Sequence, residues 1–520
     1  MAKWDDGYVT DVAYTAHFYR EITPAWLAMA SVLLGHRPTN LAQPFSYADL
    51  GCGNGFTALI VAATCPHAEV WGFDFNPAHI EFARGIAAAA GLNNAHFAET
   101  SFEDLAALPA SALPDFDIMV THGVLSWVSR ENRQHLIATI GRKLKPGGLC
   151  YLSYNVTTGW AAMVPVQALM RALTVTSRDR SDLAAPGVLD FIDRLKQAGA
   201  AFFQAHPTLE TRLQDIRKQD PRYIAHEYLN QGWYPLMFAD VANEMAEAKC
   251  HYIGSATLPA NIDSVAVPAN VLPLLAEVRD PVLRETIRDI GCAQQFRRDL
   301  FRRGVAPMPA PEQQAMLENI ALAGLGQKAP EGGITFSTPV GNVTGLPEVY
   351  EPLLAILEVA GTLSIGQARQ SPTLAGRSLL ELMQAFTLLV AGGFAHPMLP
   401  DGGTAEGRAA SRRLNATIAA ANRNAGELTQ LAAPMLGAAI ASEALETLVI
   451  GDLLAGRPAE VQSLVTGLLA TLGRSGRGMQ RDGQPVTDPA EANRIMTEAI
   501  ATILERRLPV FRRVGVLDSG

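Results

Sequence analysis

YADLGCGNGFTALIVAA, residues 47–63, is the segment from which the fold of this 520-residue chain is best predicted. It has the pattern of a buried strand that ends in Asp49, a turn that contains Gly51, Gly53 and Gly55, and an apolar helix. Glycine is required where the backbone must approach a ligand closely or adopt a positive φ. A strand, a glycine turn and a helix in this order predict a nucleotide-binding site.

Strands and helices alternate after this segment. Strand patterns recur at residues 68–75, 94–100, 116–124 and 149–156, and helical patterns separate them. This alternation predicts an α/β, Rossmann-like fold with a parallel sheet and helices on both faces. Asp74, at the end of the second strand, stands where an acid accepts the ribose hydroxyls of a nucleotide. The turn reads GxGxG and not GxGxxG, which disfavours NAD or FAD as the ligand.

Three motifs carry a resemblance to a known family: DLGCGNG at 49–55, GFDFNP at 72–77 and LKPGG at 144–148. They resemble the signature of class I S-adenosylmethionine-dependent methyltransferases, which implies S-adenosylmethionine as the cofactor and methyl transfer as the activity. In that family the glycine turn wraps the methionine part of the cofactor, an acid holds the ribose and an apolar residue packs on adenine. The positions that match these cofactor-binding residues are Asp49, Gly51, Gly53, Gly55, Asp74 and Phe75. Ser101, followed by Phe102, takes the place of an acid that often contacts the adenine amino group.

Four further motifs narrow the resemblance: HGVLSWV at 122–128, SYNVTTGW at 153–160, HEYLNQGWYP at 226–235 and QFRRDLFRRG at 295–304. They look like a bacterial subfamily that carries a methyltransferase regulatory domain. This subfamily includes rickettsial-type protein-lysine methyltransferases of outer-membrane proteins. The resemblance therefore implies a protein substrate that is methylated on lysine side chains.

Candidate catalytic residues follow the fourth and fifth strands, since ligands of open α/β sheets bind at the carboxyl ends of the strands. The candidates are His122, Trp127, Tyr154, Asn155 and Trp160. His122 is expected either to line the methionine end of the cofactor or to accept a proton, because a lysine with a pKa of ~10.4 must be deprotonated before it can attack. Tyr154 and Asn155 are expected where the substrate enters. The tryptophans would steer an amine by cation–π attraction or serve as packing aromatics.

Two alternatives remain open at this point: a small-molecule methyltransferase, and a non-catalytic scaffold that binds S-adenosylmethionine. The sequence lacks a D/N-PP-F/Y motif after the fourth strand, which argues against methyltransferases that use this motif to act on amides or nucleobases.

No metal site is expected. His226 and Glu227 begin a zinc-protease pattern, but Asn230 occupies the position that its second histidine requires.

The expected organisation places an N-terminal aromatic helical cap before the cofactor domain and a mostly helical, winged-helix-like region after it. The cap includes Tyr8, Tyr14, Phe18, Tyr19 and Trp26 and serves either as packing or as a flap over the site. The predicted segments are the cap at 1–46, the cofactor domain at 47–160, a helical insertion at 161–234, a regulatory-type region that completes the sheet at 235–305, a linker at 306–346 and a C-terminal interaction domain at 347–520.

Composition limits the partners. The net charge is −9, which disfavours a nucleic acid as the main partner, because a phosphate-binding surface needs a basic stripe. The five cysteines are scattered and predict reduced thiols. The N-terminus has no apolar signal region and no apolar run is long enough to cross a bilayer, so we expect a cytoplasmic protein. The helical insertion makes a homodimer conceivable.

Overall fold

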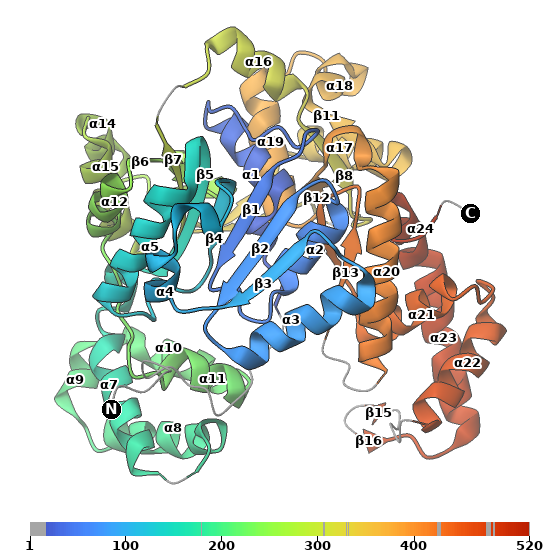
Figure 1. Cartoon of the computed structure of the whole chain (residues 1–520), viewed down its shortest axis with the longest axis horizontal. Coiled ribbons are helices and arrows are strands. Elements are labelled where there is room, and N and C mark those ends of the chain that lie inside the picture. The colour runs from blue at the N-terminus through green and yellow to red at the C-terminus, as the bar shows by residue number, and fades with distance from the viewer. Residues whose placement is uncertain are drawn as a thin grey trace.

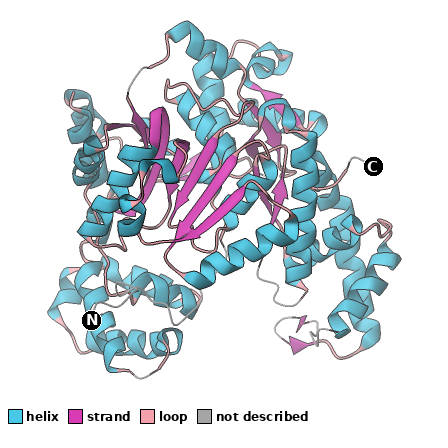
Figure 2. Ribbon diagram, in the orientation of Figure 1, coloured by secondary structure: helices cyan, strands magenta, loops and turns pink. Residues whose placement is uncertain are grey.

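A mixed sheet of seven strands forms the centre of the molecule (Figures 1 and 2). The structure is a computed structural model that describes residues 17–177, 179–304, 307–328, 330, 332–423, 428–474, 480–481 and 484–518. The strand order is β3-β2-β1-β4-β5-β7-β6, in which β1 to β5 run parallel and β7 runs antiparallel to both of its neighbours. The strands are β1 (Ser46–Leu50), β2 (Glu69–Asp74), β3 (Ala95–Glu99), β4 (Phe116–Thr121), β5 (Leu144–Asn155), β6 (Cys250–Ser255) and β7 (Phe296–Arg303).

Helices cover both faces of the sheet, as the alternating pattern predicts. One face packs into a core with α1 (Pro24–Leu33), α2 (Phe56–Thr64) and α3 (Pro77–Ala90). The other face packs into a second core with α4 (Phe102–Ala107), α5 (Arg130–Lys143) and α12 (Phe238–Glu247). All nine residues of α2 are buried, because the helix lies between the sheet and a later helix, α20 (Ala405–Asn422). A helix that is apolar all round needs such cover on every side.

A helical insertion follows β5 and forms the lobe at the lower left of Figure 1. It has a core of its own, separate from the two cores of the sheet. Its helices are α6 (Thr157–Trp160), α7 (Met163–Thr176), α8 (Ser181–Gln197), α9 (Ala201–Ala205), α10 (Thr208–Arg217) and α11 (Pro221–Tyr228). The chain then returns through α12 to β6 and reaches β7 by way of α13 (Asp263–Ala266), α14 (Leu272–Glu277) and α15 (Pro281–Cys292). The two last strands of the sheet therefore come from a region beyond the insertion.

The segment 306–346, predicted to be a linker, instead contains regular structure. It holds α16 (Ala310–Glu318), β8 (Ala321–Gly324), β9 (Thr335–Thr338) and β10 (Gly341–Thr344). β8 is the middle strand of a small sheet with β11 (Thr362–Ser364) and β12 (Ala395–Pro397), and its Leu322 and Ala323 are fully buried. Proline and glycine mark the ends of these short elements, so a composition typical of linkers does not exclude them.

The C-terminal region is mostly helical and shares the first core with the sheet. Helix α20 packs on α2 and α3, and the Arg413 Nε donates to the Ala90 carbonyl at 2.9 Å. An outer group, α21 to α23, forms a separate small core at the lower right of Figure 1. The remaining elements are α17 (Pro347–Ala360), α18 (Ile365–Gln370), α19 (Leu379–Ala391), β13 (Gln430–Ala433), β14 (Ala438–Ala441), α21 (Ala444–Leu454), α22 (Val461–Arg474), β15 (Gln480–Arg481), β16 (Gln484–Pro485), α23 (Pro489–Thr502) and α24 (Leu508–Arg513).

The expected aromatic cap is described from residue 17 onward, so Tyr8 and Tyr14 lie outside the described residues. Trp26 in α1 is 2% exposed, and its Nε1 donates to the Ala256 carbonyl at 2.8 Å. In the part of the chain that the structure describes, we find no helix with the length and apolar run that a bilayer crossing requires.

Candidate active site

The glycine turn after β1 has the backbone that its sequence predicts. Gly51, Gly53 and Gly55 have φ values of 78°, 56° and 70°, a region that favours glycine. A Cβ on Gly51 would lie 2.5 Å from Val124 Cγ2, and one on Gly55 would lie 2.5 Å from a ring carbon of Phe97. A Cβ on Gly53 would meet no atom within 4 Å. Gly51 and Gly55 therefore permit close packing, whereas Gly53 faces open space that a ligand can fill.

Asp74 is held against this turn at the end of β2. Its Oδ2 accepts a hydrogen bond from the Gly53 amide at 2.8 Å. Its Oδ1 accepts from the Asn76 amide at 2.9 Å and lies 3.2 Å from His79 Nδ1. An ionised carboxylate offers about four acceptor positions, so Oδ2 keeps capacity for a ligand hydroxyl. Asp49, at the end of β1, is buried, and burial together with the charge of Asp74 raises its pKa to about 7.

The residues predicted on the adenine side have partners within the chain. Phe75 is half-buried beside Asp74. Ser101 caps α4: its Oγ accepts from the Asp104 amide at 3.0 Å and donates to Asp104 Oδ2 at 2.7 Å. The ring of Phe102 lies 3.6 Å from the position of a Cβ on Gly51 and packs on the second core. An adenine contact by the Ser101 side chain would have to compete with the cap and stays a prediction.

His122 lies directly after β4 in an aromatic setting. Its Nδ1 lies 2.8 Å from Tyr151 Oη, and its ring stacks on Tyr19 with centroids 3.8 Å apart. Burial, with smaller contributions from Arg298 and His17, lowers the pKa of His122 to about 3. The imidazole is therefore neutral near pH 7 and is a poor acceptor for the proton of an ammonium group. Of the two roles expected for His122, this favours lining the site over accepting a proton.

Tyr154 does not reach this site. Successive side chains of a strand point to opposite faces, and in β5 Tyr151 packs in the first core whereas Tyr154 packs in the second. Tyr154 is 1% exposed, and its Oη donates to Asp299 Oδ2 at 2.6 Å. The prediction that Tyr154 meets the substrate is not supported, because the alternation of β5 directs Tyr151 to His122 in its place.

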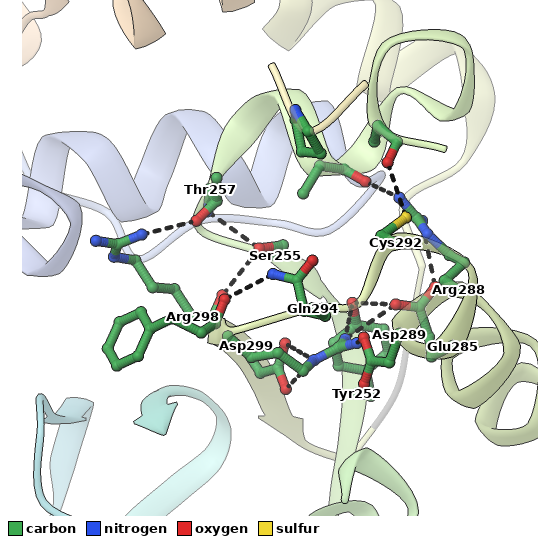
Figure 3. Close-up of a pocket in the computed structure, with 15 residues that line it drawn as sticks. Tyr252, Ser255, Thr257, Glu285, Arg288, Asp289, Cys292, Gln294, Arg298 and Asp299 are labelled. Carbon is green, nitrogen blue, oxygen red and sulfur yellow. Dashed lines mark hydrogen bonds and ion pairs between the residues drawn. The ribbon is translucent and has the colours of Figure 1, made fainter. Parts of the chain in front are cut away.

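The Tyr154–Asp299 bond belongs to a buried charge network around Arg297. The Arg297 guanidinium contacts Asp299 at 2.9 Å, Asp289 at 2.7 Å and Glu285 at 2.9 Å. The network borders a cavity of about 170 Å³. Figure 3 shows Asp299, Asp289, Tyr252 and Glu285 grouped on one side of this cavity and Arg298 on the other. These carboxylates pair with arginine inside the fold, so the network holds β5, β7 and α15 together.

Asn155, Trp127 and Trp160 lie where the sheet joins the helical insertion. The Asn155 amide donates to Ser126 Oγ at 2.8 Å, which fixes the loop after β4. Trp127 stacks on Trp233 with centroids 6.2 Å apart, and Trp160 meets Trp233 edge-on at 5.3 Å. Both Trp127 and Trp160 pack on the core of the insertion. The Arg212 guanidinium carbon lies 4.0 Å from the centroid of the Trp160 ring, so Trp160 already contacts a cation of the chain, and the steering of a substrate amine by either tryptophan stays a prediction.

Sequence reasoning did not single out Tyr151 as a partner of His122, and it placed Tyr19 only in the aromatic cap, as packing or as a flap over the site. The Tyr19 amide donates to Thr57 Oγ1 in the first turn of α2 at 3.1 Å, so Tyr19 joins the glycine turn to His122. Two features of the sequence could have located them. The alternation of side chains along β5 points to Tyr151, and the aromatic cap includes Tyr19.

Comparisons with known proteins agree with this geometry. A family model described as "Methyltransferase domain" matches residues 45–230, and one described as "Predicted methyltransferase regulatory domain" matches residues 220–303. An uncharacterised protein of Synechocystis sp. is 33% identical over 99% of both chains. The chain belongs to the family of methyltransferases that carry this regulatory domain. It is an S-adenosylmethionine-dependent methyltransferase.

Two further comparisons place the methyltransferase among its relatives. Trans-aconitate 2-methyltransferase of Methylobacterium radiotolerans is 30% identical over 33% of this chain and 60% of its own. The structure of PKMT2 from Rickettsia typhi in complex with AdoHcy has a TM-score of 0.72 and 20% identity, and the match covers 97% of this chain and 99% of that one. The second comparison shows that the fold is shared over the whole length, including the insertion and the C-terminal region.

The residues present fit S-adenosylmethionine. The open space at Gly53 admits a ligand against the backbone of the turn, and the free acceptor capacity of Asp74 lies beside it. The neutral His122–Tyr151 pair offers polar groups without a positive charge, so it does not repel a sulfonium. No group of three His, Cys, Asp or Glu side chains among the described residues is arranged to hold a metal ion.

Proposed function

We propose that the enzyme transfers the methyl group of S-adenosylmethionine to lysine side chains of a protein substrate. The observation that carries this proposal is the likeness in fold to PKMT2, which extends over 97% of this chain and whose name denotes a protein lysine methyltransferase. The likeness includes the helical insertion and the C-terminal region. The trans-aconitate enzymes, in contrast, align with only about a third of the chain.

In this proposal the glycine turn and Asp49 border the methionine part of the donor, Asp74 binds the ribose, and Phe75, Ser101 and Phe102 border the adenine. The bound donor supplies a methyl group that its sulfonium already activates. The tasks of the chain are then to align the acceptor nitrogen behind the methyl carbon and to exclude water. His122, held by Tyr151 and covered by Tyr19, lines the methionine end as a neutral polar group.

A small-molecule acceptor is the second candidate, and the names of the trans-aconitate relatives favour it. These relatives match the part of the chain that holds the donor, and donor binding is common to both candidates. A scaffold that binds the donor without turnover is the third candidate. The three differ in where a transferred methyl group is found.

The test is incubation of the full-length enzyme with methyl-labelled S-adenosylmethionine and a fractionated cell extract. We expect label in intact protein bands, methyl-lysine after acid hydrolysis, and loss of label with His122→Phe. Label confined to the low-mass fraction would reject the lysine proposal in favour of a small molecule. An absence of label in every fraction, with normal donor binding, would indicate a scaffold.

A further inference from the structure

The cavity of about 170 Å³ beside the Arg297 network has no part in the proposed methyl transfer. It is bordered by β6, β7 and α15, and by Pro339, which joins β9 to β10 in the C-terminal region. One water molecule needs about 15 Å³, and a cavity of about 150 Å³ holds a benzene ring, so a ligand of about six heavy atoms has room here. The charged and polar side chains that line the cavity in Figure 3 indicate a polar ligand.

One wall of the cavity is acidic. The Arg297 guanidinium is shared by three carboxylates, and Asp289 reaches it with Oδ1 at 2.7 Å. Asp289 lines the cavity and is 2% exposed, and among the described residues its Oδ2 has no hydrogen-bond partner. The neighbouring Arg288 is shared by Glu285 and Asp263, each at 3.3 Å. A buried carboxylate oxygen without a donor is costly, and an ammonium group in the cavity would supply that donor.

The wall across the cavity is basic. Arg298 follows Arg297 in β7, so the two side chains leave opposite faces of the strand. Arg298 Nη1 donates to Thr257 Oγ1 at 3.3 Å, and the guanidinium carbon lies 5.0 Å from the centroid of the Phe296 ring. Within the described ranges, no salt bridge of Arg298 is found, and its buried Nε has no hydrogen bond. A guanidinium in this state suits a carboxylate, which it can bind through two parallel hydrogen bonds.

We propose that this cavity is a second ligand site, which binds a small amino acid as its zwitterion, with the ammonium group at Asp289 and the carboxylate at Arg298. An amine alone would leave Arg298 unpaired, and a carboxylate alone would leave Asp289 Oδ2 unpaired. The zwitterion satisfies both groups without adding net charge to the interior. Glycine, alanine and β-alanine have the size that the cavity admits.

Phe296 connects this site with the donor site. It lines the cavity next to Arg298, and its ring meets the His122 ring edge-on with centroids 5.9 Å apart. The positive charge of Arg298 disfavours a sulfonium placed beside His122, and a ligand carboxylate on Arg298 would offset this repulsion. An occupied cavity should therefore raise the affinity for S-adenosylmethionine about fivefold, the lower end of the usual coupling between sites. S-adenosylhomocysteine has no sulfonium charge, so its affinity should change little.

Isothermal titration calorimetry of the full-length enzyme tests the site. The probes are glycine, alanine and β-alanine, with methylammonium and acetate as the two halves of the ligand. We expect at least one zwitterion to bind with a Kd of about 1 mM or below, and each half to bind at least about 30-fold more weakly. If none of the three zwitterions binds, or if either half binds as tightly as they do, the inference is overturned.

Two variants locate the bound amino acid. Arg298→Gln and Asp289→Asn should each weaken its binding at least about tenfold. Glu277→Gln and Arg279→Gln, which remove exposed charges in and after α14, are the matched controls and should leave it unchanged. Asp289→Asn also weakens the ion pair with Arg297, so circular dichroism verifies its fold, and Arg298→Gln tests the site if that variant does not fold. Unchanged affinity in a folded variant would place the ligand elsewhere and reject the site.

The coupling to the donor is measured in the same experiments. By linkage, saturating S-adenosylmethionine must raise the affinity for the amino acid by the same factor by which the amino acid raises the affinity for the donor. Arg298→Gln should abolish this factor. An equal factor for S-adenosylhomocysteine, or no factor for either, would refute the coupling through Arg298. These are binding measurements without turnover, so their outcome is independent of whether the enzyme labels lysine.

Discussion

At the scale of single residues, the donor site depends most on Asp74, because its carboxylate joins the glycine turn to the end of β2. The bond from the Gly53 amide fixes the turn, and we propose that the same carboxylate binds the ribose of the donor. Loss of this side chain removes both functions together.

Asp74→Ala should abolish measurable S-adenosylmethionine binding. The matched control is Glu81→Ala, which removes an exposed acid from α3. Isothermal titration calorimetry gives the affinity, and circular dichroism verifies that both variants are folded. Donor affinity that stays unchanged in Asp74→Ala would refute the proposed role of this acid.

His122 should remain neutral throughout the physiological range, because burial and the nearby Arg298 lower its pKa to about 3. NMR titration of the labelled imidazole, compared with a His122→Gln variant for assignment, measures this directly. The unfolded chain binds this proton near pH 6.5, so the buried neutral ring lowers stability as the pH falls from about 6.5 toward 3. A titration of His122 near pH 6.5 would contradict the described environment.

Residues whose role is local could be located from the sequence, and residues whose partners are remote could not. The glycine turn and Asp74 belong to one strand–turn–helix–strand pattern, so their proximity follows from local spacing. Tyr19 and His122 are far apart in the sequence, and their rings stack only because the chain folds. Tyr154 was misassigned for a different reason: the strand was recognised correctly, but the face on which each of its side chains lies was not considered.

At the scale of elements, the pairing of β5 with β7 connects the cofactor part of the sheet to the region that follows the insertion. Arg297 on β7 contacts three carboxylates, those of Glu285, Asp289 and Asp299, and is 7% exposed. Breaking a buried network by removing one partner is costly, because the remaining charges stay buried without compensation.

Arg297→Met should lower the free energy of unfolding by about 3–5 kcal/mol. Arg279→Met, which removes an exposed arginine between α14 and α15, is the control and should change it by less than about 0.5 kcal/mol. Urea unfolding followed by circular dichroism measures both. Combining Arg297→Met with Asp289→Asn should recover part of the loss, and a variant as stable as the unmodified protein would show that the network contributes little.

The predictions of elements succeeded where an element is long and periodic. The first five strands of the sheet alternate with helical patterns, and the Rossmann-like fold was predicted from that alternation, whereas β7 reads FRRDLFRR and has no clear apolar pattern. β8 escaped prediction because it has four residues and its partners, β11 and β12, come much later in the chain. Its burial is a property of the assembled sheet and not of its own sequence.

At the scale of the whole molecule, the C-terminal region is part of the same packed body as the sheet. α20 lies on α2 and α3, and a Cβ on Gly407 would lie only 2.8 Å from the Thr64 carbonyl oxygen. Small residues at this contact let the two helices approach closely. The expectation of an appended interaction domain did not include this shared core.

Gly407→Val should therefore destabilise the protein by about 1–3 kcal/mol, because the added side chain forces α20 away from α2. Gly473→Ala serves as a control, since a Cβ there meets no atom within 4 Å. Scanning calorimetry should show that the principal transition moves as one unit to a lower temperature. A separate shift of a C-terminal transition alone would contradict a common core.

The burial of α2 on every side has a consequence for how the enzyme exchanges its donor and product. Because α2 is enclosed between the sheet and α20, it cannot shift without disrupting two interfaces. The glycine turn at the start of α2 is therefore held in place on one side of the donor site. Passage of a molecule the size of S-adenosylmethionine is then expected to depend on movement on the side of Tyr19, whose ring stacks on His122 and whose amide bonds to Thr57.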